Sequence, residues 1–335
     1  MMMRIAINGF GRIGRNFLRT LLLDTTAQEK MQVVAINIGP AQKESIAHMF
    51  MYDTIMGTYP GSVSIEDDYL TIDTTRIRIV AEKDALKLPW KELSIDWVVE
   101  ASGRFTNRQD ATLHLQAGAD KLLITAPAHD DDITIIPGVN DAAYDPANHQ
   151  IISLGSCTSN ALLPMLKVVD EAFGIDQGCM TTVHAYTNTQ VLLDVEGEDL
   201  RRSRAAALNI IPTSTGSSKM IGKILPHLHN RIQATAIRVP VAIVSLIDLT
   251  VTTKKEVTIE ALHQAFSAAA QRMPTIIDLC TQPLVSTDFK GNAHSIIIDT
   301  QLTSVSGTTM AKLFGWYDNE WAYSTRLKDF LISTQ

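Results

Sequence analysis

The first 150 residues alternate between short apolar runs and segments whose apolar positions recur at helical spacing. A run at residues 5–7 is followed by a helical pattern from Phe17 to Leu22, and a second run follows at 33–36. The amphipathic segment 111–119 lies between two later runs. These later runs, all of strand length, lie at 77–80, 97–99, 122–124 and 133–136. Such alternation predicts a doubly wound parallel sheet with helices on both faces.

From about residue 155 the pattern changes, and strand-like runs dominate. The helical patterns of this half cover 162–173 and 259–272. Its strand candidates lie at 180–184, 234–239, 243–252 and 294–299. These runs predict an α+β domain whose sheet is mostly antiparallel and is backed by helices. We therefore expect two domains, at 1–155 and 156–319, with a C-terminal helix at 320–335 that packs back on the first domain.

The composition agrees with two globular domains. The chain has 335 residues, and domains commonly hold about 150. Its 45% hydrophobic and 19% charged residues exclude a disordered chain, and its net charge of −7 argues against general binding to nucleic acid or to an anionic membrane. There is no run of about 20 apolar residues, so we expect a cytoplasmic protein. The three cysteines form neither a disulfide framework nor a Cys-x-x-Cys pair, so we expect no metal site.

A glycine pattern lies directly between the first strand and the first helix. It reads Gly9-x-Gly11-x-x-Gly14. In this context glycines permit a tight turn and a close approach of the backbone to a pyrophosphate, and the helix N-terminus offers amides to the anion. We therefore expect a Rossmann-type dinucleotide site at this turn.

The second strand lacks the acid that usually binds the ribose of NAD. An acid is expected about 20 residues after the glycines, but the chain there reads AINIGP at residues 35–40. Asn37 is a candidate to bond the ribose, although an amide would not repel a 2′-phosphate. No arginine lies in this segment to bind such a phosphate. The interpretation therefore favours NAD as cofactor, with NADP left open.

A cysteine and a histidine in the second half are candidates for nucleophilic catalysis. Cys157 precedes a helical pattern, and the positive end of a helix lowers the pKa of a thiol. Pro164 leaves the start of that helix open, because proline breaks a hydrogen bond inside a helix. His184 lies at the end of a strand candidate, and the fold could bring the two side chains together. Taken singly, each residue is more often structural.

Together with their neighbours, these motifs resemble the phosphorylating glyceraldehyde-3-phosphate dehydrogenases along nearly the whole chain. The matching blocks are AINGFGRIGR at 6–15, SCTSN at 156–160, TVHAYT at 182–187, NIIPTSTG at 209–216, RVP at 238–240 and WYDNE at 316–320. The resemblance implies an NAD(P)-dependent glycolytic oxidoreductase with a dinucleotide-binding domain followed by a catalytic domain. It also implies a homotetramer that uses glyceraldehyde 3-phosphate and inorganic phosphate.

The resemblance also assigns roles to individual residues. Cys157 would attack the aldehyde, and His184 would act as base. The residues implied for phosphate binding are Thr187, Arg202 and Arg238 for the substrate, and Ser156, Thr158, Thr215 and Gly216 for inorganic phosphate, with Arg238 near both. Those implied for the cofactor are Gly9, Gly11, Arg12, Ile13, Gly14, Asn37, Lys83, Thr125 and Asn319. Lys83 and Ile38 replace the family's usual arginine and aspartate.

Two alternatives stay open at this point. Erythrose-4-phosphate dehydrogenases have a similar fold and a Cys–His pair, but they release a free acid. Their Thr-Gly and His-Ala-Tyr-Thr segments tend to be altered, whereas Thr215-Gly216 and residues 184–187 are intact here. An inactive nucleotide-binding scaffold would be expected to lose Cys157, His184 or Arg238, and all three are present.

Overall fold

The computed structural model describes residues 2–335. These residues form two compact units. The first unit comprises residues up to Ile135 together with Ala142–Ser156 and Ser324–Gln335. The second comprises Ile136–Asp141 and Cys157–Tyr323. Among the described residues, no helix combines the length and the apolar character that a membrane crossing requires.

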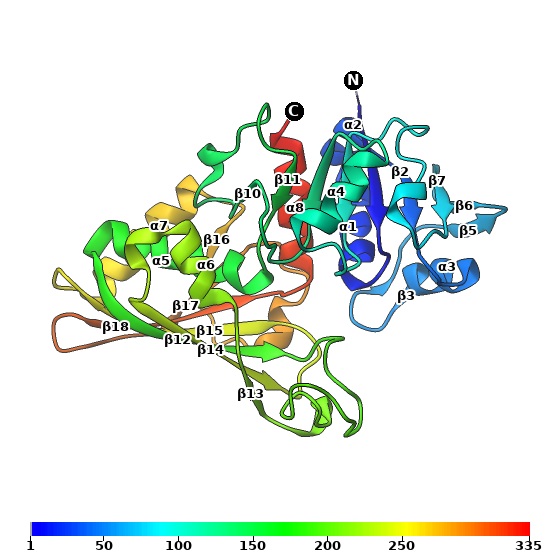
Figure 1. Ribbon diagram of the computed structural model, residues 1–335. Helices are drawn as coiled ribbons and strands as arrows, with labels where there is room; N and C mark the ends of the chain where they lie inside the picture. The colour runs from blue at the N-terminus through cyan, green and yellow to red at the C-terminus, as the bar shows by residue number, and fades with distance from the viewer. Residues whose placement is uncertain (1) are drawn as a thin grey trace. The chain divides into compact units, whose positions relative to one another are not determined.

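The sheet of the first unit is mostly parallel (Figure 1). From one edge to the other its strands are β10 (Ile133–Thr134), β11 (Ile151–Ser153), β9 (Lys121–Ile124), β8 (Trp97–Glu100), β1 (Met3–Asn8), β2 (Met31–Asn37), β7 (Thr75–Val80), β6 (Tyr69–Ile72) and β5 (Val63–Glu66). The antiparallel pairs are β5 with β6 and β6 with β7. Two short strands, β3 (Tyr52–Asp53) and β4 (Gly57–Thr58), pair separately. The expected Rossmann-type parallel sheet is confirmed.

Helices cover both faces of this sheet. They are α1 (Arg12–Leu22), α2 (Thr25–Lys30), α3 (Lys43–Met51), α4 (Arg108–Gln116) and the larger part of α8 (Trp321–Ser333). Ala111 of α4 belongs to one buried cluster with Val98 of β8. Phe330 of α8 packs edge-on against the adjacent Trp97, with ring centroids 6.0 Å apart. Because neighbouring residues of a strand point to opposite faces, α4 and α8 lie on opposite sides of the sheet.

The sheet of the second unit is mostly antiparallel. Its order is β13 (Ile211–Thr213), β14 (Ile232–Val239), β12 (Ile175–Ala185), β15 (Ser245–Thr253), β18 (Met310–Tyr317), β17 (Ile296–Ser306) and β16 (Ile277–Cys280). The parallel pairs are β12 with β14 and β16 with β17. The expectation of a mostly antiparallel sheet in an α+β arrangement is confirmed.

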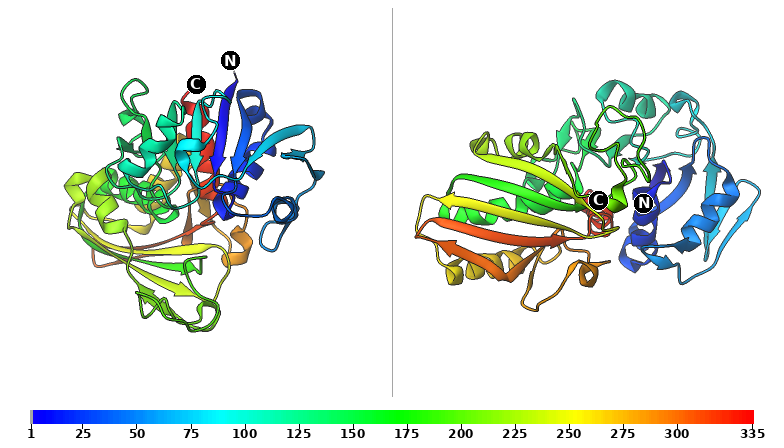
Figure 2. Two further views of the ribbon diagram at one scale, coloured as in Figure 1. Left: turned by 45° about the vertical axis from the view of Figure 1, so that its right-hand side comes forward. Right: turned by 90° about the horizontal axis from the view of Figure 1, so that it is seen from below.

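Three helices cover one face of the second sheet. They are α5 (Cys157–Phe173), α6 (Ser217–Ile224) and α7 (Ile259–Arg272), and Figures 1 and 2 show them on the same side. In β15 every second residue is buried, starting with Ser245, which is the pattern of a strand with one covered face. Leu162 and Leu166 of α5 and Phe266 of α7 lie in the resulting core. Pro164 lies inside α5, so the helix begins at Cys157 despite the proline.

Candidate active site and nucleotide pocket

The glycine turn of the first unit leaves the N-terminus of α1 open to an anion. Gly9 has φ +93°, and a Cβ there would lie 2.5 Å from the backbone of Ser102. A Cβ on Gly14 would lie 2.3 Å from the Gly9 carbonyl oxygen. Gly11 forms the N-cap with no side-chain hydrogen bond, and nothing lies within 4 Å of a Cβ built on it. A helix N-terminus that has no side-chain cap and lies beside open space fits a pyrophosphate.

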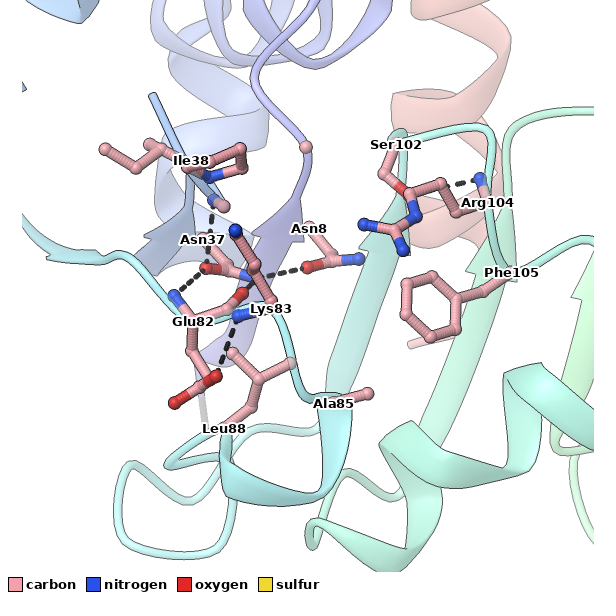
Figure 3. A pocket seen from close by; sticks show the side chains of 13 residues that line it. Asn8, Asn37, Ile38, Glu82, Lys83, Ala85, Leu88, Ser102, Arg104 and Phe105 are labelled. Carbon is pink, nitrogen blue, oxygen red and sulfur yellow. Dashed lines mark hydrogen bonds between the residues drawn. The ribbon is translucent and has the colours of Figure 1, made fainter. Parts of the chain in front are cut away.

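An open pocket lies beside this turn, at the carboxyl ends of the central strands (Figure 3). Its walls are Asn8, Gly9, residues 37–40, Glu82, Lys83, Ala85, Leu88, Ser102, Arg104 and Phe105. In open parallel sheets, ligands bind outside the carboxyl ends of the strands. The pocket therefore has the position that a dinucleotide requires.

The Asn37 side chain is fully occupied by protein groups. Its Nδ2 donates to the Asn8 side chain at 2.7 Å and to the Glu82 carbonyl at 2.9 Å. Its Oδ1 accepts from the amides of Gly39 at 3.3 Å and Glu82 at 3.0 Å. An amide group has two donor and two acceptor positions, so none is left for a ribose. Asn37 shapes the pocket wall, and its proposed bond to the ribose is not supported.

A buried polar cluster lies below the pocket. The Asn8 amide donates to the Glu100 carboxylate at 2.5 Å, and the Ser102 amide donates to the same carboxylate at 2.8 Å. The Trp90 indole donates to Nδ1 of His114 at 3.0 Å. Glu100 and His114 have almost no exposed surface. Because buried polar groups with complete hydrogen bonding are rigid, this cluster fixes the strand ends that carry the pocket.

Two further residues predicted for the cofactor have structural contacts in this unit. Arg12, the first residue of α1, forms an ion pair with the buried Asp53. Burial opposes ionisation of Asp53, but hydrogen bonds from the Met56 amide and from Arg12 outweigh it and hold the pKa of that carboxyl below its usual value. The Thr125 hydroxyl donates to the Glu100 carbonyl at 2.9 Å. Both contacts fix these side chains near the strand ends.

The second unit brings the predicted cysteine and histidine together. Cys157 is the first residue of α5, and His184 lies at the end of β12. The Cys157 Sγ lies 3.5 Å from Nε2 of His184. The His184 Nδ1 lies 2.6 Å from the Ala185 carbonyl oxygen, which can only accept a hydrogen bond. The ring therefore presents Nε2 to the sulfur and Nδ1 to the Ala185 carbonyl.

Arg238 completes this arrangement from the neighbouring strand. His184 and Arg238 are paired residues of β12 and β14. The Arg238 guanidinium donates to the Ala185 carbonyl at 2.8 Å and lies 2.9 Å from Nδ1 of His184. It also donates to the Thr187 hydroxyl at 3.5 Å. The Cys–His pair therefore has a fixed positive charge beside it.

Burial determines the charges of the resting pair. Burial and the Arg238 charge lower the pKa of His184 to about 3. Burial also raises the pKa of the Cys157 thiol, while Arg238 and hydrogen bonds from Thr158 lower it by less. The expected lowering of the thiol pKa is therefore wrong in direction, because burial outweighs the positive charge and the hydrogen bonds around the sulfur. The resting pair is a thiol beside a neutral imidazole.

Tyr317 of β18 was not predicted from the sequence, although it contacts both α5 and β12, the elements that carry Cys157 and His184. Its hydroxyl lies 3.0 Å from the Thr158 hydroxyl and 2.8 Å from the Thr182 hydroxyl. Its ring packs edge-on against His184, with centroids 6.0 Å apart. Burial raises its pKa, so it stays a neutral phenol. The position of Tyr317 within the WYDNE block was the only signal in the sequence.

Three of the predicted phosphate ligands, Arg202, Thr215 and Gly216, lie in or contact the segment 213–217. Arg202 donates to the Thr213 hydroxyl at 2.7 Å and to the Ser214 carbonyl at 3.3 Å. Its charge lowers the pKa of Arg238, although burial is the main cause of that shift. Thr215 lies 2.9 Å from the Ser217 hydroxyl, and Gly216 is the N-cap of α6. Hydroxyls, guanidinium groups and free helix amides are suitable ligands for phosphate oxygens.

Three predicted residues remain: Asn319, Ile13 and Ser156. Asn319 accepts a hydrogen bond from Ser245 at 3.1 Å, and Ser245 accepts one from the Ala185 amide at 3.1 Å. Asn319 is therefore tied to the strand end that carries His184. Ile13 lies in the first turn of α1. Ser156 is the residue directly before α5.

Comparisons with known proteins agree with this site. Residues 3–108 match the family model described as glyceraldehyde 3-phosphate dehydrogenase, NAD binding domain. Residues 156–319 match the one described as glyceraldehyde 3-phosphate dehydrogenase, C-terminal domain. A glyceraldehyde-3-phosphate dehydrogenase 2 of Bacillus subtilis is 46% identical over 332 residues, which cover 99% of this chain and 96% of the relative. A chloroplastic glyceraldehyde-3-phosphate dehydrogenase A of Chlamydomonas reinhardtii is 47% identical, covering 97% of this chain and 87% of the relative.

Proposed function

Because the chain belongs to the glyceraldehyde-3-phosphate dehydrogenase family, we propose that it oxidises glyceraldehyde 3-phosphate to 1,3-bisphosphoglycerate, with NAD(P) as the hydride acceptor. The observation that carries this proposal is the 3.5 Å contact between Cys157 Sγ and His184 Nε2. An enzyme that oxidises an aldehyde through a thiol needs a sulfur nucleophile and a neighbouring base, and the unprotonated imidazole of His184 is such a base.

The first chemical step follows from the protonation of the pair. The Nε2 lone pair of His184 accepts the thiol proton as Cys157 Sγ attacks the aldehyde carbon, which gives a thiohemiacetal. The amide of Cys157, at the N-terminus of α5, and the protonated His184 then stabilise the oxygen that gains negative charge. The low basicity of the buried imidazole makes its proton easy to return in the later steps.

The later steps use the same residues. The protonated His184 gives its proton to the negatively charged oxygen, which forms the hydroxyl of the thiohemiacetal. The neutral His184 then removes the hydroxyl proton as the carbon loses its hydride, and a thioester on Cys157 results. NAD(P), when bound, supplies the hydride acceptor. An oxygen of inorganic phosphate then attacks the thioester carbon, and the C–S bond breaks to release the acyl phosphate and restore the thiolate, which His184 reprotonates.

We assign separate residues to the cofactor, to the phosphate of the substrate and to the attacking phosphate. The first unit holds the cofactor through the open amides of α1 and the pocket at the strand ends. In the second unit, Thr187, Arg202 and Arg238 bind the phosphate of the substrate. Ser156, Thr158, Thr215 and Gly216 bind the attacking phosphate. Asn319 orients the nicotinamide amide.

We also propose a cytoplasmic homotetramer. The segment between β12 and β13 exposes several large apolar side chains, among them Leu192, Leu200, Leu208 and Ile210, which are 70–82% exposed in the single chain. Exposed apolar patches of this kind mark interaction surfaces. Light scattering coupled to gel filtration should give four times the mass of 36.8 kDa.

The test is phosphate-dependent formation of NAD(P)H from glyceraldehyde 3-phosphate. Omission of phosphate should stop turnover, and Cys157→Ser should lower kcat by roughly 10³-fold or more. His184→Asn should lower it by about 10²- to 10⁴-fold, because it removes the base. Equal rates without phosphate, with erythrose 4-phosphate preferred, would assign the chain to the hydrolytic alternative instead.

A further inference from the structure

The wall of the nucleotide pocket carries no acid where an NAD site usually has one. An acid at the end of the second strand accepts the ribose hydroxyls of NAD and repels a 2′-phosphate. At the end of β2 the chain has Asn37 and Ile38. The Asn37 amide is saturated by the protein, and Ile38 is an apolar side chain that is 8% exposed. Nothing at this strand end selects against a phosphate.

The Glu82 carboxylate, which lines the pocket, accepts hydrogen bonds from backbone amides of its own loop. Oε1 of Glu82 accepts hydrogen bonds from the amides of Lys83 at 2.8 Å and Asp84 at 2.9 Å. Figure 3 shows this carboxylate pointing away from Asn8 and Asn37. Glu82 therefore organises the loop after β7 and does not stand in for the missing ribose ligand.

Two cations on the pocket wall have no partner in the part of the chain that the structure describes. No hydrogen bond or ion pair involves the Lys83 ammonium or the Arg104 guanidinium, and both residues are exposed. Three other cations near the pocket loops or elsewhere in this unit have acidic partners. The pairs are Arg78 with Glu92, Lys87 with Asp84, and Arg108 with Asp132. Lys83 and Arg104 are therefore available to an anionic ligand.

The two cations come from different loops. Lys83 follows β7, and Arg104 follows β8. Figure 3 shows the ammonium and the guanidinium pointing from opposite walls towards the space beside Asn8 and Asn37. An ammonium with a guanidinium fits a phosphate dianion, because one supplies a compact charge and the other a planar pair of donors.

We propose that Lys83 and Arg104 form a subsite for the 2′-phosphate of NADP, so that this chain binds NADP at least as tightly as NAD. The proposal rests on the proposed dehydrogenase function, since it concerns the adenosine end of the same cofactor. It also reverses the preference for NAD drawn from the sequence, because the arginine that matters lies on the loop after β8 and not at the end of β2.

Isothermal titration calorimetry with NAD and with NADP tests the subsite without turnover. Lys83→Gln and Arg104→Gln should each weaken NADP binding by about threefold to tenfold, the range for exposed charge contacts. NAD binding should change by less than twofold in both variants. Ile38→Asp should weaken NADP binding and strengthen NAD binding, because a carboxylate repels the phosphate and accepts the ribose hydroxyls.

Lys87→Gln is the matched control. Lys87 carries the same charge on the neighbouring turn but does not line the pocket, so its loss should leave both affinities unchanged. Adenosine 2′,5′-bisphosphate and adenosine 5′-monophosphate give a second comparison, in which only the first should respond to Lys83→Gln and Arg104→Gln.

The outcomes separate this proposal from the proposed function. If NADP binds more weakly than NAD, or if its affinity is unchanged in both glutamine variants, the subsite is wrong and the dehydrogenase function stands. If neither dinucleotide binds the unmodified chain, the proposed function itself fails, and the subsite fails with it.

Discussion

Arg238 contacts the general base and one of the predicted substrate ligands with a single guanidinium. It reaches the carbonyl of Ala185, the imidazole of His184 and the hydroxyl of Thr187 from the adjacent strand. Burial is the main cause of the low pKa of the imidazole, and the Arg238 charge lowers it further. The same charge opposes the rise that burial causes in the pKa of Cys157. The Arg238 charge therefore helps the sulfur to lose its proton, and it also lowers the basicity of the nitrogen that accepts this proton.

Removal of this charge should make the thiol less reactive. In Arg238→Leu the pKa of Cys157 should rise further, since burial remains and the opposing charge is lost. The rate of alkylation by iodoacetamide should shift to higher pH, with about a tenfold loss at fixed pH for each unit by which the pKa rises. Arg231→Leu, which removes an exposed arginine just before β14, is the control. An unshifted profile in Arg238→Leu would contradict the electrostatic role.

Tyr317 should act as a positioning residue. Tyr317→Phe removes the hydroxyl that joins Thr158 to Thr182, and it leaves buried hydroxyls with one partner fewer. We expect a loss of about 1–3 kcal/mol in the free energy of unfolding and a lower kcat with little change in KM. Urea unfolding and steady-state kinetics measure the two effects. Tyr69→Phe on β6 is the control, and an unchanged kcat in Tyr317→Phe would leave only a structural role.

At the scale of elements, close packing at Gly9 and Gly14 fixes the position of α1 relative to the strand ends. Gly14 packs against the carbonyl of Gly9, and Gly9 packs against the loop after β8. These contacts bring the first turn of α1 close to the strand ends. The open N-terminus of the helix is therefore a consequence of two positions that exclude a side chain.

Two alanine substitutions in this turn should behave differently. Gly14→Ala places a Cβ 2.3 Å from a backbone oxygen, so we expect a loss of about 2–3 kcal/mol in stability and weak dinucleotide binding. Gly11→Ala meets open space, so its melting temperature should change little. Thermal unfolding compares them. Equal melting temperatures would contradict the close packing of Gly14.

The elements with strong periodicity were predicted well from the sequence. The helix expected at 259–272 has the bounds of α7, and the parallel strands of the first unit lie where the apolar runs lie. The helix α3 was missed because it buries only Ile46 and Phe50. The strands β5, β6 and β18 were also missed, since β5 has no buried residue and only half of the residues of β6 and β18 are buried.

The site residues that belong to a local sequence motif could be predicted from the sequence. Cys157, His184 and the glycine turn belong to such motifs. The saturation of Asn37 depends on Glu82, and the contacts of Tyr317 depend on Thr158 and Thr182, which lie far away in the chain. No local pattern indicates such long-range contacts. The direction of the thiol pKa also depends on burial, which is a property of the folded unit.

At the scale of the whole molecule, the two ends of the chain meet within the first unit. Lys328 of α8 forms an ion pair with Asp24, which also caps α2 by accepting from the Ala27 amide at 3.1 Å. Phe330 packs against Trp97 and against Tyr144, with centroids 6.0 and 5.2 Å away. The first unit is therefore completed only when the last helix has been made.

The pair between Asp24 and Lys328 should give a pH-dependent stability. Burial opposes ionisation of Asp24, but hydrogen bonds from Lys328 and the Ala27 amide outweigh it and lower its pKa below 3.8. A lowered pKa in the folded state contributes stability above the unfolded value, and this is lost as the pH falls through the folded value. Asp24→Asn should therefore cost about 0.5–1 kcal/mol at pH 7 and progressively less below pH 4.

Thermal melts of Asp24→Asn, Lys328→Met and the double variant at pH 7 and pH 3.5 measure this effect. If the pair interacts as described, the double variant should lose less than the sum of the single losses at pH 7. Additive losses at pH 7, or a difference that grows at pH 3.5, would contradict the assignment.

The polar cluster below the nucleotide pocket has a consequence for how such a protein changes over generations. Asn8, Asn37 and Glu100 hold the strand ends through contacts that no cofactor atom is needed to complete. The rim residues Ile38, Lys83 and Arg104 share none of these side-chain contacts. Mutation of a rim residue can therefore change the preference of the protein between NAD and NADP. The fold and the reaction at Cys157 would stay the same.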